Sequence, residues 1–401
     1  MKSFTSLLLL GALAYTAAAD ELTDIAPDDV NGLNVTQIIV DSSNSGIDLS
    51  LLNCTTDALD FINTAAVVAN STTTRRRRKR ANTGNGIDVH SHLVFPWYQD
   101  LVPTTGGNPT PDWTLEDHLS FSAGLSITKT ILGNSAPQAN VYFGNKALTV
   151  ALARLLNISV AAIRSLYPKK FDFFCVVPLP YVSDAIAEAK YCLDTLGGVG
   201  ITTMTNHEGL YLGNSALDGF WSYVNSRTDK PIVYVHPTTP YLKVNGKYVE
   251  ANPTLYMPGL VEFYFETARC YMDLSYSGVL TKYTNIRWIA AHVGGAFPSI
   301  LDRMIKSLGT SMETTLKSVY NTRVFWDSAG PTYPSQVKGL LGYGIPKSQL
   351  LMGTDFPYAP AGSYTGAMAG LVNDLADFTQ TDINNILRNN SIALFGKKLN
   401  L

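Results

Sequence analysis

The stretch Gly86–Leu93, GIDVHSHL, decides the fold, because it places two histidines at the end of an apolar, β-branched run. Such a run predicts a buried β-strand. Side chains alternate between the two faces of a strand, so His90 and His92 point the same way, with Asp88 on the same side. The chain has 401 residues but only 6 histidines. The pair therefore predicts a functional site at the end of this strand.

Short β-branched runs recur along the chain and alternate with helical patterns. One helical pattern begins with Ser183 as its N-cap and ends at Gly197, and another covers residues 258–278. The other expected strands cover residues 127–133, 171–179, 200–205, 231–237, 286–294, 323–329 and 349–357. Eight strands, each followed by a helix or a long loop, predict an α/β fold, a (β/α)8 TIM barrel. An open doubly wound sheet is the alternative, although no GxGxxG follows the first strand.

In a parallel barrel, functional groups lie at the carboxyl ends of the strands. Three further residues stand at such ends here: His236 in VYVHPTTP, His292 in IAAHVGG and Asp355 in LLMGTDFPY. Together with His90 and His92 they supply imidazoles and one carboxylate. This donor set suits a borderline divalent ion that keeps one position open for water or substrate. We predict a metal site at this end of the barrel.

The two remaining histidines carry less information. His118 lies in TLEDHLSF on an expected helix, and we interpret it as a core or surface residue. His207 follows the fourth strand in TMTNHEG, where a position in the pocket and a structural role are equally compatible with the sequence.

The N-terminus has the features of a secretory signal peptide. Residues 1–19 contain Lys2, the apolar run LLLLGALAY and three alanines before Asp20. The apolar run is too short for a membrane-spanning helix. A buried hydrophobic helix is the alternative interpretation.

Residues 20–80 are expected to form a pro-segment. They are acidic, rich in Ser, Thr and Asn without a clear period, and end in the basic run RRRRKR. Basic runs are often solvated patches or nuclear signals. Behind a signal peptide, the Lys79-Arg80 pair instead predicts cleavage by a subtilisin-like proprotein convertase. The barrel domain is then expected at residues 85–396.

Composition excludes several classes of partner. The chain is 46% hydrophobic and 15% charged, with a formal net charge of −2, which is an ordinary globular balance. It favours neither nucleic acid nor an anionic membrane as a partner. No stable membrane span is expected once the signal peptide is removed.

Sequons and cysteines give weaker hints. Five sequons predict a secreted glycoprotein, although such short motifs often occur by chance; they begin at Asn34, Asn53, Asn70, Asn157 and Asn389. Cys54 belongs to the expected pro-segment. The other three cysteines, Cys175, Cys192 and Cys270, form no CxxC motif. We interpret them as mostly buried, small apolar residues.

Seven stretches, all in order, resemble the amidohydrolase-related decarboxylases of the aminocarboxymuconate-semialdehyde decarboxylase type, and most closely the fungal 6-methylsalicylate decarboxylase-like proteins. They are IDVHSHLVFP, DWTLEDHLSF, FCVVPLPYVSDAIAEAKYCLDTLGGVGITTMTNHEGLYLGN, VYVHPTTP, FETARCYMDLSYSGVL, IRWIAAHVGGAFPSILDR and LLMGTDFPYAP. The resemblance covers roughly residues 85–396. It implies a TIM barrel of the metal-dependent hydrolase type, a homodimer and a small aromatic acid as substrate.

The resemblance also implies roles for the strand-end residues. His90, His92, His236 and Asp355 would bind the metal, and His292 would be the acid or base beside the open position. The ion is usually zinc, or manganese in phenolic-acid branches that begin Glu-x-His. This chain has His90-x-His92, so zinc is expected. The implied activity is that of a carboxy-lyase releasing CO2, with Asp355 or His292 delivering the proton to carbon.

A flat substrate ring calls for aromatic walls. The tentative substrate contacts are Phe95, Trp113, His207 and Phe356, with Trp97 and Tyr211 as further aromatic loop residues. Arg269 in ETAR is equally compatible with a contact to the substrate carboxylate and with a structural ion pair.

Two alternative functions remain open. The same ligands could activate water for hydrolysis of a lactone, amide or ester. A secreted barrel without activity is the second alternative, although all five metal-site positions hold competent residues. Related decarboxylases are usually intracellular, so the signal peptide predicts an exported or endomembrane form acting in secondary metabolism.

Overall fold

The computed structural model describes residues 21–73, 86–252, 255–359, 361–373 and 377–401. The expected signal peptide and the basic run at residues 75–80 lie outside the described residues.

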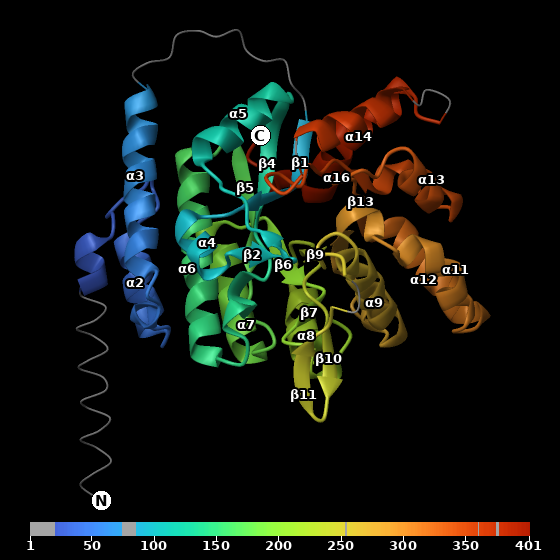
Figure 1. The fold of residues 1–401 in the computed structure, drawn as a ribbon, viewed down its shortest axis with the longest axis horizontal. Coiled ribbons are helices and arrows are strands. Elements are labelled where there is room, and N and C mark those ends of the chain that lie inside the picture. Colours follow the sequence, from blue (N-terminus) through green and yellow to red (C-terminus); the bar gives the residue numbers. More distant parts are fainter. Residues whose placement is uncertain (1–20, 74–85, 253–254, 360, 374–376) are drawn as a thin grey trace, which may run out of the picture.

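Eight parallel strands form the barrel, as the sequence predicts (Figure 1). In order around the sheet they are β1 (Gly86–Leu93), β4 (Ile127–Asn134), β5 (Phe171–Val176), β6 (Gly200–Met204), β9 (Ile232–His236), β12 (Arg287–Ala290), β13 (Val324–Asp327) and β14 (Leu350–Leu351). The last strand returns to the first, because Val89 N donates to Met352 O at 3.0 Å and Thr354 N donates to His90 O at 3.0 Å. The carboxyl ends of all eight strands therefore surround one mouth.

Helices follow the strands and cover the outside of the barrel. They include α4 (Pro96–Leu101), α5 (Leu115–Gly124), α6 (Lys146–Leu166), α7 (Val182–Tyr191), α8 (Asp218–Ser226), α9 (Glu262–Tyr276), α10 (Val279–Lys282), α11 (Phe297–Lys306), α12 (Thr310–Thr322), α13 (Ser335–Gly342), α14 (Ala361–Asn373), α15 (Gln380–Asn384) and α16 (Asn390–Phe395). Three short hairpins extend the loops: β2 (Thr104–Thr105) with β3 (Asn108–Pro109), β7 (Asn206–His207) with β8 (Leu210–Tyr211), and β10 (Tyr241–Val244) with β11 (Lys247–Glu250).

Two of these helices test the sequence interpretation directly. The pattern at 183–197 becomes α7 and a π-helical turn that ends at Gly197, whose φ of 82° explains the glycine. The start was wrong by one residue, since α7 begins at Val182 and Ser183 is no N-cap. The pattern at 258–278 becomes α9, which is shorter at both ends.

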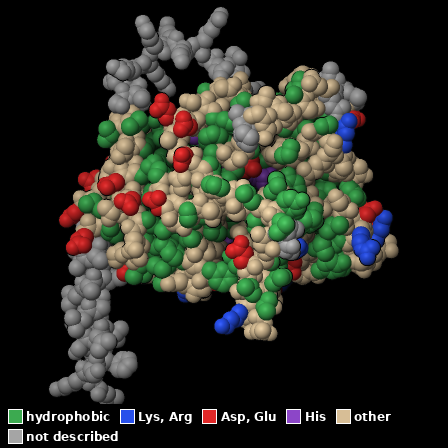
Figure 2. All heavy atoms as spheres, in the orientation of Figure 1, with side chains coloured by type: hydrophobic (Ala, Val, Ile, Leu, Met, Phe, Trp, Pro, Cys, Tyr) green, Lys and Arg blue, Asp and Glu red, His purple; other side chains and the backbone are tan. Residues whose placement is uncertain are grey.

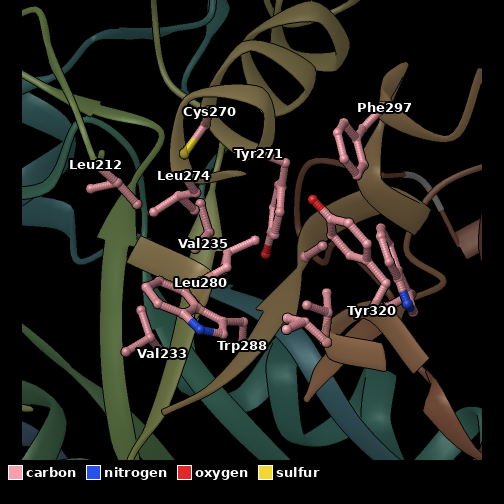
Figure 3. Packing of buried hydrophobic residues seen from close by; sticks show 14 of the residues in the cluster. Leu212, Val233, Val235, Cys270, Tyr271, Leu274, Leu280, Trp288, Phe297 and Tyr320 are labelled. Atoms are coloured by element: carbon pink, nitrogen blue, oxygen red, sulfur yellow. The ribbon is translucent and has the colours of Figure 1, made fainter. Parts of the chain in front are cut away.

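Apolar side chains fill the space between the strands and the outer helices. Figure 3 shows one such region, in which Val233, Val235 and Trp288 from the strands pack with Tyr271 and Leu274 of α9. Burial of a side chain of this size stabilises the fold by about 1.5–3 kcal/mol. The barrel is therefore a rigid support for the loops at its mouth.

Residues 21–73 are also folded, contrary to the interpretation of a segment without a period. They form α2 (Val35–Asn44), a short 3-10 turn (Leu49–Leu51) and α3 (Thr55–Thr73), which lie beside α6 (Figure 1). The helical pattern is weak in the sequence because threonine occurs on both the buried and the exposed face of α3, and several of its buried positions hold only alanine. Removal of the segment as a pro-segment stays a prediction.

The helix α6 is covered on both sides. It has the length and hydropathy of a membrane span, but 78% of its most apolar window is buried within the protein, as in the core helix of a globular fold. Asn157, one of the five sequon positions, is fully buried in α6 and donates to Val176 O at 2.9 Å. It therefore cannot accept a glycan in the folded protein.

The three cysteines of the barrel are buried, as interpreted, but two of them are not free thiols. Cys175 at the end of β5 and Cys192 after α7 form a disulfide, with a Cα–Cα distance of 5.9 Å. Their separation of 17 residues hides the pairing in the sequence, because only the return of α7 along β5 brings them together. Cys54 and Cys270 are free and buried.

Candidate metal centre

All four predicted metal ligands and His292 meet at the barrel mouth. His90 and His92 lie on β1, His236 ends β9, His292 lies in the turn after β12 and Asp355 follows β14. Two of them have left-handed backbone, with φ of 52° at His292 and 63° at Asp355. Non-glycine residues in this region cost free energy and cluster at functional sites. The loop before Asp355 is also tight, because a Cβ on Gly353 would lie 2.7 Å from His90 Cβ.

The polar atoms converge closely enough to hold one ion. His90 Nε2 lies 3.1 Å from His92 Nε2, and Asp355 Oδ1 lies 3.2 Å and 3.0 Å from these two atoms. Ligand atoms of His90, His236, His292 and Asp355 all lie within 4.8 Å of one another. Zinc–nitrogen bonds of about 2.0–2.1 Å in tetrahedral geometry separate ligand atoms by about 3.3–3.4 Å. The residues present fit a divalent ion.

Hydrogen bonds fix the orientation of two rings. His236 Nδ1 lies 2.7 Å from Pro237 O, so it carries the proton and leaves Nε2 free for an ion. His292 Nδ1 lies 3.3 Å from Ala329 O, and the His292 ring stacks on Tyr264 with centroids 5.6 Å apart.

Electrostatics divide the site into neutral and charged groups. Burial lowers the pKa of His92, of His236 and of His292, so these imidazoles are neutral at pH 7. Burial acts to raise the pKa of Asp355, but the charge of His90 outweighs it and holds the pKa well below its usual range. Neutral imidazoles beside an ionised carboxylate are what a cation site requires.

Asp327 is the site residue that the sequence interpretation missed. It ends β13, and its two carboxylate oxygens each lie 3.0 Å from His90 Nδ1. Its Oδ1 also accepts from His292 N at 3.2 Å. This carboxylate orients His90 in the way carboxylates often orient metal-binding histidines. Its place near a strand end was the available signal, since it stands two residues before the end of the expected strand 323–329.

Asp88 supports the site through the backbone of β1 and through Thr354. Its carboxylate accepts from His90 N at 3.0 Å, Thr354 N at 3.1 Å and Thr354 Oγ1 at 2.7 Å. Burial raises the pKa of Asp88 to about 7. Asp88 therefore joins β1 to the segment that carries Asp355 and leaves the imidazole rings to other partners.

A cavity of about 910 Å³ opens over the centre. His92, His236, His292 and Asp355 reach its floor. Figure 2 shows histidine atoms in a hollow surrounded by apolar side chains. Its walls include Pro109, Pro111, Met257, Leu260, Phe263, Tyr264, Pro331 and Tyr358. Among the described residues that line the cavity, none is lysine or arginine, so a bound carboxylate has no side-chain cation to pair with.

The substrate contacts predicted from the sequence do not line this cavity. Phe95 and Trp113 are buried against the N-terminal segment, with Phe61 5.3 Å from Phe95 between ring centroids, and Trp97 belongs to the same cluster. Phe356 stacks on Phe121 at 4.3 Å. Their apolar rings are used in the core, which explains why loop position alone was misleading.

The polar candidates are also occupied elsewhere. His207 Nδ1 lies 2.6 Å from Asn140 Oδ1, and burial lowers the pKa of His207 to about 3. Arg269 forms an ion pair with Glu266 at 2.8 Å. Of the two roles that the sequence left open for Arg269, the structure therefore shows the structural ion pair. Tyr211 donates to Glu266 Oε1 at 2.7 Å.

His118 is a core residue, as one interpretation predicted. Its Nδ1 accepts from Trp113 Nε1 at 3.0 Å, and its Nε2 lies 3.2 Å from Ser91 Oγ. Ser91 stands between the two histidines of β1. His118 therefore links the helix α5 to the strand that carries the first two ligands.

Comparison with known proteins agrees with this geometry. The profile of the family described as Amidohydrolase matches residues 87–397. The chain belongs to the amidohydrolase family. The decarboxylase yanB of Aspergillus niger is 32% identical over 68% of this chain and 77% of its own length. A 6-methylsalicylic acid decarboxylase of Penicillium expansum is 32% identical over 68% of this chain and 85% of its own length.

A solved amidohydrolase-type barrel supports the fold. The structure of a dihydroxybenzoic acid decarboxylase from Polaromonas sp., with manganese and 2-nitroresorcinol bound, superposes with a TM-score of 0.62. It covers 79% of this chain and 100% of its own, at 18% identity.

We predict that replacing Asp327 with asparagine in this amidohydrolase lowers its metal affinity about 10- to 100-fold, because loss of an orienting carboxylate has this effect in other metal sites. The side chain keeps its size, so the fold should persist. Titration with Zn²⁺ against a chromophoric chelator measures the affinity. An unchanged dissociation constant would show that Asp327 does not orient a ligand.

Metal binding should release about one proton at pH 7. Burial acts to lower the pKa of His90, but Asp327 and Asp355 outweigh it and raise the pKa to about 10. Below pH 10, His90 in the metal-free site is therefore an imidazolium with a proton on each ring nitrogen. It must lose the Nε2 proton to bind an ion. Affinity should rise about tenfold per pH unit between pH 7 and 9. Calorimetry in buffers of different ionisation enthalpy measures the proton count, and a value of zero would contradict this account.

Proposed function

We propose that the protein is a metal-dependent, non-oxidative decarboxylase of a small hydroxyaromatic acid similar to 6-methylsalicylate. The observation that carries the proposal is a cluster of four histidines and an aspartate at the floor of an apolar cavity. The names of the fungal relatives support the same reaction. Apolar walls fit a flat ring, and the polar floor fits the carboxylate and phenolic oxygens.

A bound divalent ion would supply the positive charge that anchors the two oxygens and stabilises the ring after it loses aromaticity. His90, His92, His236 and Asp355 would hold this ion. We propose zinc, because the donor set is mostly imidazole. Manganese is the competitor, since it is present in the Polaromonas decarboxylase.

His292 and Asp355 are the candidates for moving the proton. Both are deprotonated at neutral pH, because the pKa of each is lowered. Either group first takes the phenolic proton and then delivers it to the ring carbon that bears the carboxylate. The bond from that carbon to the carboxylate breaks and CO2 leaves. The electron pair of the broken bond stays on the ring and restores its aromaticity, which gives a phenolate. The phenolate takes a proton from water on release.

A metal analysis combined with an activity screen tests the proposal. Purified protein loaded with zinc or manganese is incubated with 6-methylsalicylate and other hydroxybenzoates. The expected result is formation of m-cresol and CO2 from 6-methylsalicylate. Turnover of lactones, amides or esters in place of decarboxylation would favour a hydrolase. Absence of both metal and turnover would favour an inactive barrel.

We also propose that the protein enters the secretory pathway and acts as a homodimer. The signal-like residues 1–19 and the Cys175–Cys192 disulfide support an oxidising compartment. Cell fractionation tests the location, and intact protein with residues 1–80 in the cytosol would contradict it. Light scattering of the purified protein tests the dimer.

A further inference from the structure

Residues 21–73 are the part of the protein that the proposed chemistry does not use, yet one face of this segment is buried against the barrel. Their buried apolar side chains include Val35, Ile38, Ile39, Leu49, Leu52, Leu59 and Ile62. These residues share one hydrophobic cluster with the helix α6 and with the residues that follow β1. The segment therefore contributes to the hydrophobic core of the protein.

The helix α6 depends on this cover. Each of its residues from Thr149 to Ile163 is buried, so α6 has no solvent-facing side in its central turns. Arg154 of α6 forms a buried ion pair with Glu188, in which Nε lies 2.8 Å from Oε2. Its Nη1 donates a hydrogen bond to Ser42 Oγ of the segment at 2.8 Å. Loss of the segment would expose an apolar helix face and leave the buried guanidinium of Arg154 without the hydrogen bond to Ser42.

The segment does not block the metal centre. Among the described residues, those that line the cavity all come from position 92 onward. The segment instead contacts residues that pack beside β1. Phe61 packs on Phe95, with ring centroids 5.3 Å apart, and on Trp113, with ring centroids 6.4 Å apart. Trp113 in turn donates to His118, which contacts Ser91 of β1.

Charge distinguishes the segment from the run that follows it. Residues 21–73 contain eight acidic and no basic residues, whereas residues 75–80 are all basic. Acidic side chains gather over this side of the molecule (Figure 2). The contacts described above join residues 21–73 to residues from position 86 onward. A cut after Arg80 would divide the protein into two chains and would break none of these contacts.

We propose that residues 21–73 are a permanent partner of the barrel, docked on α6, which stays bound as a separate chain after cleavage at the basic run. The segment supports the fold and does not inhibit the site. The uncut protein should already bind metal, and cleavage should not activate it.

Limited digestion of the purified full-length protein with a dibasic-specific protease tests this proposal. The variant in which all six basic residues at 75–80 are replaced by alanine is the uncut control, because Arg75–Arg78 contain further dibasic pairs. We expect two fragments on a denaturing gel that elute together in native gel filtration and separate only in denaturant. Zinc affinity should agree within about twofold before and after the cut. Separation of the fragments under native conditions would overturn the proposal, as would a large gain in zinc affinity after the cut.

A pair of variants on α3 tests the docking contact itself. Phe61→Ala should weaken the association of the cut fragments about tenfold or more, because this partly buried ring packs on Phe95 and Trp113 and aromatic residues dominate such interfaces. Val67→Ala is the matched control, since this side chain on the same helix is 68% exposed. Fragment dissociation is measured by gel filtration over a dilution series. Equal behaviour of the two variants would overturn the assigned contact.

Discussion

Replacing His90 with alanine is expected to lower the metal affinity by more than about 100-fold and to abolish decarboxylation. Loss of a group that only orients a ligand already lowers affinity about 10- to 100-fold, and His90 offers Nε2 directly to the centre. The substitution also leaves Asp327 without the imidazole that lies 3.0 Å from both of its oxygens. An unpaired buried charge destabilises a fold by about 3–5 kcal/mol.

Metal content after gel filtration and a zinc titration measure the effect of this change. His207→Ala is the matched control, because His207 is an equally buried histidine that lies outside the cavity. Circular dichroism establishes that both variants are folded. Full metal retention in His90→Ala would remove the basis of the proposed centre.

Replacing His292 with asparagine should lower the decarboxylation rate about 10²- to 10⁴-fold while the metal stays bound. This range is typical for loss of a general acid or base. Asparagine is the suitable substitution, because His292 has a φ of 52° and asparagine tolerates left-handed backbone better than most residues. The change therefore removes the imidazole without straining the turn after β12.

Metal content and rate must be measured on the same preparation of this variant. His207→Asn serves as the control, since it removes a buried imidazole outside the site. If His292→Asn loses metal as completely as His90→Ala, then His292 is a ligand, and Asp355 is left as the group that moves the proton. A rate within threefold of the parent protein would exclude His292 from proton transfer.

The sequence predicted the candidate metal residues because their signal is local. Each of His90, His236 and Asp355 stands at or just beyond the end of an apolar run, and parallel strands in a barrel bring such ends to one mouth. The pattern of strands in the sequence therefore predicted both the barrel fold and the residues of the candidate metal centre. Asp327 has the same signal and was overlooked, because a lone carboxylate at a strand end is less distinctive than a histidine.

The cavity wall was not predictable in the same way. Aromatic loop residues such as Phe95 and Trp113 were assigned to the substrate, but they face the N-terminal helices. The residues that do line the cavity, such as Tyr264 and Tyr358, come from α9 and from the loop after Asp355. Which face of a loop or helix turns inward depends on packing against distant segments.

The sequence by itself determined the eight-stranded barrel and the five residues that meet at its mouth, because strand period and strand ends are properties of neighbouring residues. Only the tertiary structure decided the pairing of His90 with Asp327, the disulfide between Cys175 and Cys192, and the docking of residues 21–73 on α6. These contacts join positions 17 or more residues apart. They exist because burial and complementary shape select one arrangement, for which no local pattern in the chain is required.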